Sequence, residues 1–238
     1  GMIRIVQLYP RDMNLYGDWG NARVLQKRLQ WRGVDAEIVD HNPGDPTGLD
    51  GDIFLGGGGQ DAGQDKIQED LQGHIDALRE LVEGGAPMLL ICGMYQLLGR
   101  TFVTGEGKVI KGAGILPLDT HASTDRLIGN VTLESPEFGQ VVGYENHSGR
   151  TYVDAGSEPL GKVLRGAGNN GEDQQEGLRY HNVIGTYLHG PVLPANPRIA
   201  DFLIAKALER RGMTVELGPL PVDEITEKAH RTAASRPR

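Results

Sequence analysis

The distribution of hydrophobic and polar residues predicts short strands alternating with amphipathic helices over the first hundred positions. Runs rich in branched residues predict strands at 3–8, 36–39, 52–55 and 87–91. Apolar residues at three and four spacing predict helices at 19–32 and about 65–83, each ended by glycine. This rhythm is typical of a doubly wound α/β sheet, whose functional loops lie at the carboxyl ends of the strands.

After residue 99 the pattern changes to short stretches separated by frequent turns. It predicts strands at 114–118, 129–133, 140–145 and 161–164, which we interpret as an antiparallel extension. A core strand at 183–187 and a closing helix at 197–211 follow, and the residues of that helix expected to face inward are Ile199, Phe202, Leu203, Ala207 and Leu208. The sequence therefore predicts one α/β domain over residues 2–211, and a loose polar tail over 212–238 that could bind a partner.

Composition and charge exclude several classes of function. The chain has 24 Lys and Arg residues against 32 Asp and Glu residues, and its formal net charge of -8 opposes binding to nucleic acid. The apolar run at 88–92 is far shorter than the roughly 18 residues that a membrane span needs, so we expect a soluble, cytoplasmic protein. A single cysteine excludes an internal disulfide and a Cys-based zinc cluster within one chain. No cofactor and no metal site are predicted.

The single cysteine, Cys92, lies where a buried strand is expected to turn into a helix, and Gly93 follows it. A thiol on such an elbow points out of the sheet and lies at a helix N-terminus, whose dipole favours the thiolate. The N–H of Gly93 would be available to a developing oxyanion. A lone cysteine is more often a buried structural residue, but its place at a strand end before glycine favours a nucleophile here.

A thiolate nucleophile requires a base, and the chain has seven histidines. Only His189 stands just past the end of a late core strand, where the sheet would bring it to the same edge as Cys92. His147 is the reserve candidate. A histidine after a strand is by itself more often a loop residue, so the argument rests on the two residues together.

The glycine run 56–59, followed by Gln60, comes directly after a predicted strand. It lacks the lysine and the Ser or Thr of a phosphate-binding loop, and the segment 105–109 has a lysine without the rest of that motif. Beside the elbow, the backbone N–H groups of Gly57 and Gly58 would instead complete an oxyanion hole with Gly93. A flexible turn is the alternative interpretation.

Four separated motifs come in the order and spacing of a known family. They are the segments 56–61, 91–96, 143–147 and 185–190. With them the chain resembles, from about residue 3 to 208, the class I glutamine amidotransferases of the cobyric acid synthase type, the CobB/CobQ-like group. The resemblance implies a flavodoxin-like doubly wound sheet with an antiparallel extension. It makes Cys92 the nucleophile that forms a γ-glutamyl thioester from L-glutamine and His189 the general base and then acid, and Arg126 would hold the glutamine carboxylate, a bidentate task that suits a guanidinium.

The resemblance also implies a partner. The segments 14–21 and 144–151, and the lack of an ATP-binding domain, are most similar to the family's glutaminase subunits that serve a separate MurT-like Mur ligase, which amidates the D-glutamate of lipid II in peptidoglycan synthesis. Many class I amidotransferases carry a glutamate two residues after the histidine, where this chain has Pro191. We therefore expect the MurT-like partner to supply the acidic residue, unless an Asp or Glu of this chain folds into that place.

Three other functions stay open at this point. The chain could serve another synthase, for example one of cobyrinate type, although that amidotransferase usually shares a chain with its ATP-binding domain. A catalytically silent binding module on the same scaffold would not need Cys92 and His189 in register. A thiol peptidase acting on γ-glutamyl compounds would use the same two residues, and would turn over γ-glutamyl peptides with no partner present.

Overall fold

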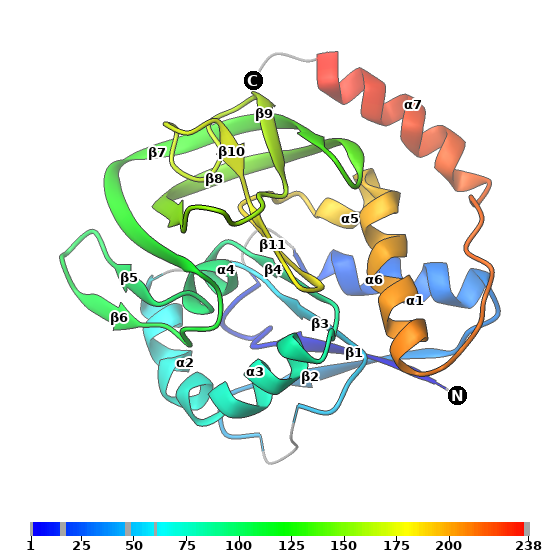
Figure 1. The fold of residues 1–238 in the computed structure, drawn as a ribbon, viewed down its shortest axis with the longest axis horizontal. Coiled ribbons are helices and arrows are strands. Elements are labelled where there is room, and N and C mark those ends of the chain that lie inside the picture. The colour runs from blue at the N-terminus through cyan, green and yellow to red at the C-terminus, as the bar shows by residue number, and fades with distance from the viewer. Residues whose placement is uncertain (1, 15–17, 46–48, 60, 236–238) are drawn as a thin grey trace.

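The computed structural model describes residues 2–14, 18–45, 49–59 and 61–235, and it contains two six-stranded sheets (Figure 1). The first sheet has the order β11-β12-β4-β3-β1-β2. Its strands are β1 (Ile3–Leu8), β2 (Ala36–His41), β3 (Ile53–Gly56), β4 (Met88–Ile91), β11 (Leu178–Tyr180) and β12 (Val183–Thr186). All but the edge strand β11 run parallel, in the 2-1-3-4-5 order of a flavodoxin-like sheet. The predicted doubly wound architecture is confirmed.

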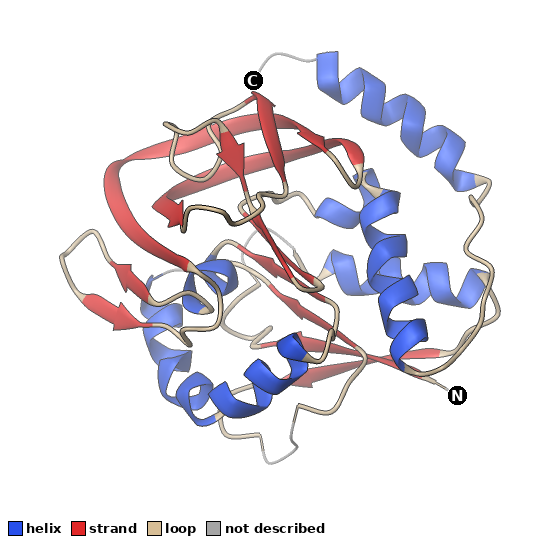
Figure 2. Cartoon of the chain, viewed as in Figure 1, coloured by secondary structure: helices blue, strands red, loops and turns tan. Residues whose placement is uncertain are grey.

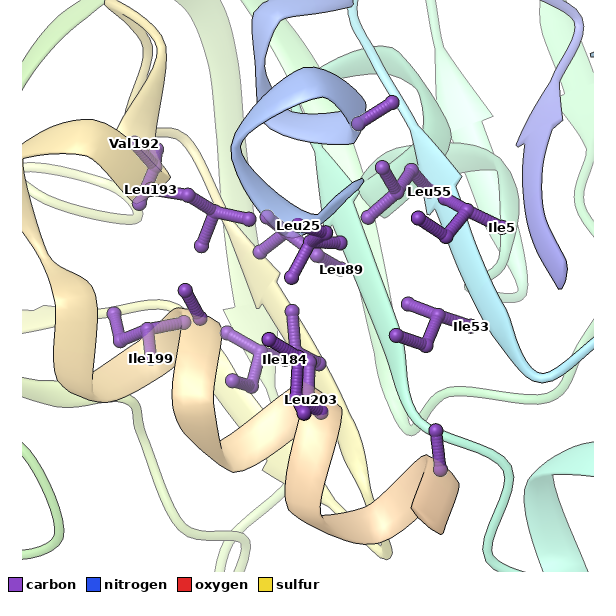
Figure 3. Packing of buried hydrophobic residues seen from close by; sticks show 14 of the residues in the cluster. Ile5, Leu25, Ile53, Leu55, Leu89, Ile184, Val192, Leu193, Ile199 and Leu203 are labelled. Carbon is purple, nitrogen blue, oxygen red and sulfur yellow. The ribbon is translucent and has the colours of Figure 1, made fainter. Parts of the chain in front are cut away.

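Helices cover both faces of this first sheet (Figure 1). The helices on one face are α1 (Gly20–Trp31), α5 (Val192–Ala195) and α6 (Pro197–Arg210), and those on the other are α2 (Asp61–Gly73), α3 (Ile75–Glu83) and α4 (Gly93–Leu97). Figure 3 shows Leu25, Leu89 and Leu203 from α1, β4 and α6 meeting in the first of the two cores. Every residue of β3, β4 and β12 is buried, as expected of central strands covered on both faces.

The closing helix is confirmed as α6, which buries four of its five predicted inward residues. Phe202 is the exception, because it is only partly buried against the core. The guanidinium carbon of Arg179 lies 4.7 Å above the centre of its ring, so a cation covers the side chain where the core does not.

The predicted antiparallel extension is the second sheet, although its strands differ from the expected ones. They are β5 (Thr101–Val103), β6 (Val109–Lys111), β7 (Leu118–Ser135), β8 (Gly139–Val153), β9 (Gly161–Arg165) and β10 (Gln175–Glu176). The predicted strands 129–133 and 140–145 are parts of β7 and β8, the long curved hairpin in Figure 2. Polar residues along the first half of β7 hide it from a hydrophobic pattern.

The strand predicted at 114–118 does not form over most of that range. The backbone N–H groups of Ile115 and Leu116 donate instead to the carbonyl of Leu98, just beyond α4. Residues 114–117 are therefore held as a loop, and the strand β7 begins only at Leu118.

The single helix predicted at 65–83 is two helices, α2 and α3, which meet at His74. Gly73 and His74 are weak helix formers, and the φ of -110° and ψ of 6° at His74 interrupt the helical conformation. The imidazole of His74 turns towards Asp70, with its Nε2 3.5 Å from Oδ2. The apolar residues keep helical spacing across His74, so their pattern predicts one helix where the structure has two.

The prediction of a loose tail is wrong for residues 222–235, which form α7 (Val222–Ser235). At its start, Asp223 binds Arg28 of α1 through two hydrogen bonds of 2.8 and 3.1 Å. The buried Arg28 also binds Asp201, which in turn binds Arg32, so two cations and two carboxylates balance. In the described part of the chain, no helix is long and apolar enough to cross a membrane.

Replacing Asp223 with alanine should free α7 from the domain, because the buried Arg28 would lose one of its two carboxylate partners at a cost of about 1–3 kcal/mol. Limited proteolysis of the full chain measures this, and cleavage within residues 212–221 should quicken several-fold. Glu224→Ala, which removes an exposed carboxylate from the same turn, is the matched control. Equal cleavage of both variants would show that the ion pair with Arg28 does not hold the helix.

Candidate active site

Cys92 lies on a sharp elbow between β4 and α4. Its φ of 52° and ψ of -106° are unusual for a residue with a side chain and store about 1–3 kcal/mol of strain. The Cys92 N–H donates to the carbonyl of Thr186 at 2.8 Å, and its carbonyl accepts the N–H of Gln96 at 3.0 Å. These bonds continue the sheet on one side and begin the helix on the other, so the partly exposed thiol stands at the edge of the sheet as predicted.

His189 reaches the same edge through the strand next to β4. Ile91 and Thr186 are paired in the parallel ladder of β4 and β12, and His189 follows Thr186 by three residues. Its backbone pairs in both directions with Tyr144 of β8, at 2.7 and 3.3 Å, which fixes the residue between the two sheets. The structure therefore brings His189 beside Cys92, as the sequence predicted.

Gly58 lies directly against both side chains. A methyl group at this position would lie 3.5 Å from Sγ of Cys92 and 3.3 Å from Cε1 of His189. The thiol and the imidazole thus face the same small space, and the absence of a side chain at residue 58 keeps that space open.

Asp18 is a member of the site that the sequence reasoning missed. It ends the loop after β1, is almost fully buried, and places Oδ1 3.3 Å from Nδ1 of His189. The family pattern places the acidic partner two residues after the histidine, where this chain has Pro191. The available signal was topological, because the loop after the first strand ends at the same edge of a parallel sheet as Cys92.

The environment of His189 favours its charged form. Burial by itself lowers the pKa of the imidazole, but the hydrogen bond to Asp18 and the neighbouring Cys92 outweigh this and raise the pKa to about 10. His189 therefore holds its proton at neutral pH and loses it only as the pH rises towards that value. An imidazolium beside a thiol favours a thiolate–imidazolium pair, the reactive form of a cysteine nucleophile.

The glycines of the loop after β3 allow close packing. A methyl group at Gly57 would lie 2.6 Å from the carbonyl oxygen of Met13, and one at Gly59 would lie 2.5 Å from that of Asp12. The loop that carries Asp18 can therefore pack this closely only because residues 57 and 59 have no side chains. Gln60 lies outside the described residues.

Of the three predicted oxyanion donors, Gly58 is already engaged. Its N–H donates to Oδ2 of Asp18 at 3.2 Å, so the same carboxylate bridges Gly58 and His189. Gly93 is the first residue of α4. The N–H groups at the start of a helix have no acceptor within that helix, and the N–H of Gly93 is one of them. The roles of Gly57 and Gly93 stay predictions.

Arg126 is exposed and lies where the pairing of β7 and β8 shifts register, between Ala122 and Leu127. Its guanidinium donates to Oδ1 of Asn146 at 2.9 Å and to the Asn146 carbonyl at 3.3 Å. The interactions of the described residues do not join it to Cys92 or His189. Its predicted role in holding a glutamine carboxylate stays a prediction.

His147, the reserve base, is part of a buried network. Its Nε2 lies 3.1 Å from Glu145, its Nδ1 lies 2.8 Å from the carbonyl oxygen of Gly149, and its ring stacks on Tyr187 with centroids 3.7 Å apart. Both ring nitrogens are thus committed to the protein. This arrangement favours His189 as the base.

Glu176 is a second supporting carboxylate that the sequence did not reveal. Burial raises its pKa to about 8, although hydrogen bonds donated by the Tyr187 N–H and the Thr186 hydroxyl oppose the shift. The Thr186 hydroxyl oxygen in turn accepts the N–H of Leu188 at 3.0 Å. Glu176 therefore fixes the segment that leads to His189.

A thiol elbow and an imidazole at the carboxyl edge of a flavodoxin-like sheet define the architecture of class I glutamine amidotransferases. The chain belongs to the CobB/CobQ-like glutamine amidotransferase family, whose domain matches residues 4–197. It is therefore a glutamine amidotransferase.

Two relatives carry a more particular name. The chain is 44% identical, over 90% of its length and 87% of the other's, to subunit GatD of the glutamine-hydrolysing lipid II isoglutaminyl synthase of Staphylococcus aureus strain N315. It is 37% identical to the subunit of the same name from Streptococcus pneumoniae strain R6, over 90% and 84% of the two chains. Among solved structures, a glutamine amidotransferase superposes with a TM-score of 0.57 at 19% identity, covering 85% of this chain and 98% of that one, which shows the shared fold.

Asp18→Asn should make Cys92 less reactive, because loss of the carboxylate removes the main support for the raised pKa of His189. The imidazolium beside Cys92 would then be lost at a lower pH than in the native chain. Alkylation of Cys92 by iodoacetamide near neutral pH should slow at least tenfold. Asp35→Asn, at an exposed aspartate, is the control. An unchanged alkylation profile would contradict a role for Asp18 in charging His189.

Gly58→Ala should impair the site without unfolding the chain. The new methyl group would press on Cβ of Cys92 at 3.1 Å and on His189, and a displacement of about 1 Å at reacting groups can cost roughly a hundredfold in rate. Gly105→Ala is the matched control, since nothing lies within 4 Å of a methyl group there. The measurements are the glutaminase rates and melting temperatures of both variants. A fully active Gly58→Ala enzyme would show that the open space at residue 58 is not required for activity.

Proposed function

We propose that this chain is the glutaminase subunit of a lipid II isoglutaminyl synthase. It hydrolyses L-glutamine to glutamate and supplies the ammonia to a MurT-like, ATP-dependent ligase that amidates D-glutamate in lipid II. The observation that carries the proposal is the Cys92 elbow beside His189, in a chain that aligns over 90% of its length with two subunits of that name. A cytoplasmic location fits the reducing environment that a free catalytic thiolate needs.

The geometry supports a two-step hydrolysis. Sγ of Cys92 attacks the side-chain amide carbon of glutamine, and the N–H of Gly93 donates a hydrogen bond to the oxygen on which negative charge develops. His189 gives its proton to the departing nitrogen, so ammonia leaves and a γ-glutamyl thioester remains. His189 then takes a proton from a water molecule, which attacks the thioester and releases glutamate and the thiol. Asp18 holds Nδ1 of the imidazole, so that Nε2 is available for both proton transfers.

Asp18 changes the expected role of the partner. We expected the MurT-like ligase to supply the acidic residue, but a carboxylate of this chain already lies beside Nδ1 of His189. The distance from Oδ1 of Asp18 to Nδ1 of His189, 3.3 Å, exceeds the roughly 2.7–2.9 Å of a strong charge-assisted hydrogen bond, so this contact could become shorter. A partner that presses on the loop could shorten this contact. Low activity alone and higher activity in a complex would then follow without a carboxylate from the partner.

Exposed aromatic and aliphatic side chains indicate where such a partner would dock. Trp19, the neighbour of Asp18, is 53% exposed, Trp31 at the other end of α1 is 56% exposed, and Ile225 of α7 is 73% exposed. A cleft of about 360 Å³ between α1 and α7 is lined by Trp31 and Val222 among others. Large apolar groups beside a catalytic loop are typical of a subunit interface. We infer that the ligase binds over α1 and α7, the helix of the predicted partner-binding tail.

Ammonia release from L-glutamine tests the proposal, with the chain alone and with a co-expressed MurT-like ligase. Wild-type release should rise at least tenfold in the complex, and Cys92→Ala should abolish it in both states. Asp18→Asn should lower the rate in the complex by a factor of about ten to 10⁴, the upper figure being the loss seen when a triad aspartate is removed.

Other outcomes would assign a different role. Full activity of Asp18→Asn in the complex would mean that the partner supplies the orienting acid. Turnover of γ-glutamyl peptides without a partner would indicate a thiol peptidase. If no condition gives Cys92-dependent ammonia, the chain is a silent binding module on the same scaffold.

A further inference from the structure

Two histidines and an aspartate converge at the carboxyl end of β2, beside the junction of α2 and α3. Nε2 of His41 lies 2.9 Å from Oδ2 of Asp70, and Nε2 of His74 lies 3.5 Å from the same oxygen. The side chain of His41 is almost fully buried, whereas that of His74 is 24% exposed. The cluster belongs neither to the catalytic pair nor to the motifs of the family resemblance, and the sequence predicted no metal.

We propose that His41, Asp70 and His74 bind one Zn²⁺ ion. Zinc takes imidazole nitrogen and carboxylate oxygen at about 2.0–2.2 Å in tetrahedral geometry, which places neighbouring ligand atoms about 3.3–3.5 Å apart. The distance from Oδ2 of Asp70 to Nε2 of His74, 3.5 Å, matches this spacing, and the distance to Nε2 of His41, 2.9 Å, is shorter. All three ligand atoms lie within 4.8 Å of one another, so binding an ion requires them to move only within the cluster.

The choice of zinc follows from the donor set. Magnesium and calcium prefer shells of oxygen, whereas two imidazoles with one carboxylate form a known tetrahedral zinc set with an open fourth position. Three protein ligands leave the fourth tetrahedral position to solvent, which the exposure of His74 permits.

The surroundings hold the carboxylate in place for this task. The Gly44 N–H donates to Oδ1 of Asp70 at 3.1 Å, and the Tyr9 hydroxyl donates to Oδ2 at 2.6 Å. Such outer bonds orient metal ligands in proteins. Nδ1 of His41 has no hydrogen-bond partner among the described residues.

The site would stabilise the start of the catalytic loop. Tyr9 adopts a φ of 55°, donates its N–H to the His41 carbonyl at 2.6 Å, and accepts the N–H groups of Asp12 and Met13 at its own carbonyl. The loop that begins with these bonds ends at Asp18, the residue that holds His189. A zinc ion bound to His41 and Asp70 would fix both groups that contact Tyr9.

Zinc binding by the full chain tests the proposal, in a Cys92→Ala background so that the catalytic thiol cannot take the metal. The protein is treated with a chelator and freed of it, and its zinc content and affinity are measured by elemental analysis and by competition with a chromophoric chelator. We expect one Zn²⁺ per chain. At a free zinc concentration about 100 times Kd, the melting temperature should rise by roughly 5–10 °C.

His74→Gln and Asp70→Asn should each weaken zinc binding at least tenfold and, at the same zinc concentration, remove about half of the thermal shift or more. His121→Gln, at an exposed histidine on β7, is the matched control and should bind like the parent. Two variants are used so that a folding defect in one leaves the other as a test. Failure of the parent to retain zinc, or equal affinity in all variants, would overturn the proposal and leave a hydrogen-bonded cluster only.

Discussion

The active site depends on the parallel pairing of β4 with β12. One hydrogen bond, from the N–H of Cys92 to the carbonyl of Thr186, extends this ladder by a single step beyond the last strand residue. It holds the elbow in its strained conformation and sets the starting point of the short segment that ends at His189. Because both strands are wholly buried between two helical layers, neither can slide without exposing apolar surface. The separation of nucleophile and base is thus a consequence of the packing of the sheet.

Asp18 adds a second level of control, because one carboxylate binds two parts of the catalytic apparatus. Oδ1 contacts the imidazole of His189, and Oδ2 accepts the N–H of Gly58, a group that could otherwise face an oxyanion. Movement of a single loop would therefore alter the orientation of the base and the availability of a backbone donor together. Asp18 is itself buried, while its neighbour Trp19 is 53% exposed, so the carboxylate lies one residue from the protein surface.

The sequence was sufficient for features that depend on local pattern and strand order. Cys92 and His189 could be found because each follows a buried strand, and parallel strands end at a common edge. Asp18 could not be found this way, since the contact with His189 spans 171 residues and depends on how a loop crosses bare glycines. Local pattern also failed at two places. The apolar stripe around His74 is unbroken and gives no sign of the contact between His74 and Asp70. The tail is polar and gives no sign of the ion pair that joins α7 to Arg28.

The backbone pairing of His189 with Tyr144 has a mechanical consequence. It joins His189 to β8, a strand of the other sheet, so this histidine belongs to the contact between the two sheets. Cys92, by contrast, is bonded through its N–H to Thr186 at the end of β12 in the first sheet. A shift of the β7–β8 hairpin against the first sheet would therefore bear directly on His189 and only indirectly on Cys92.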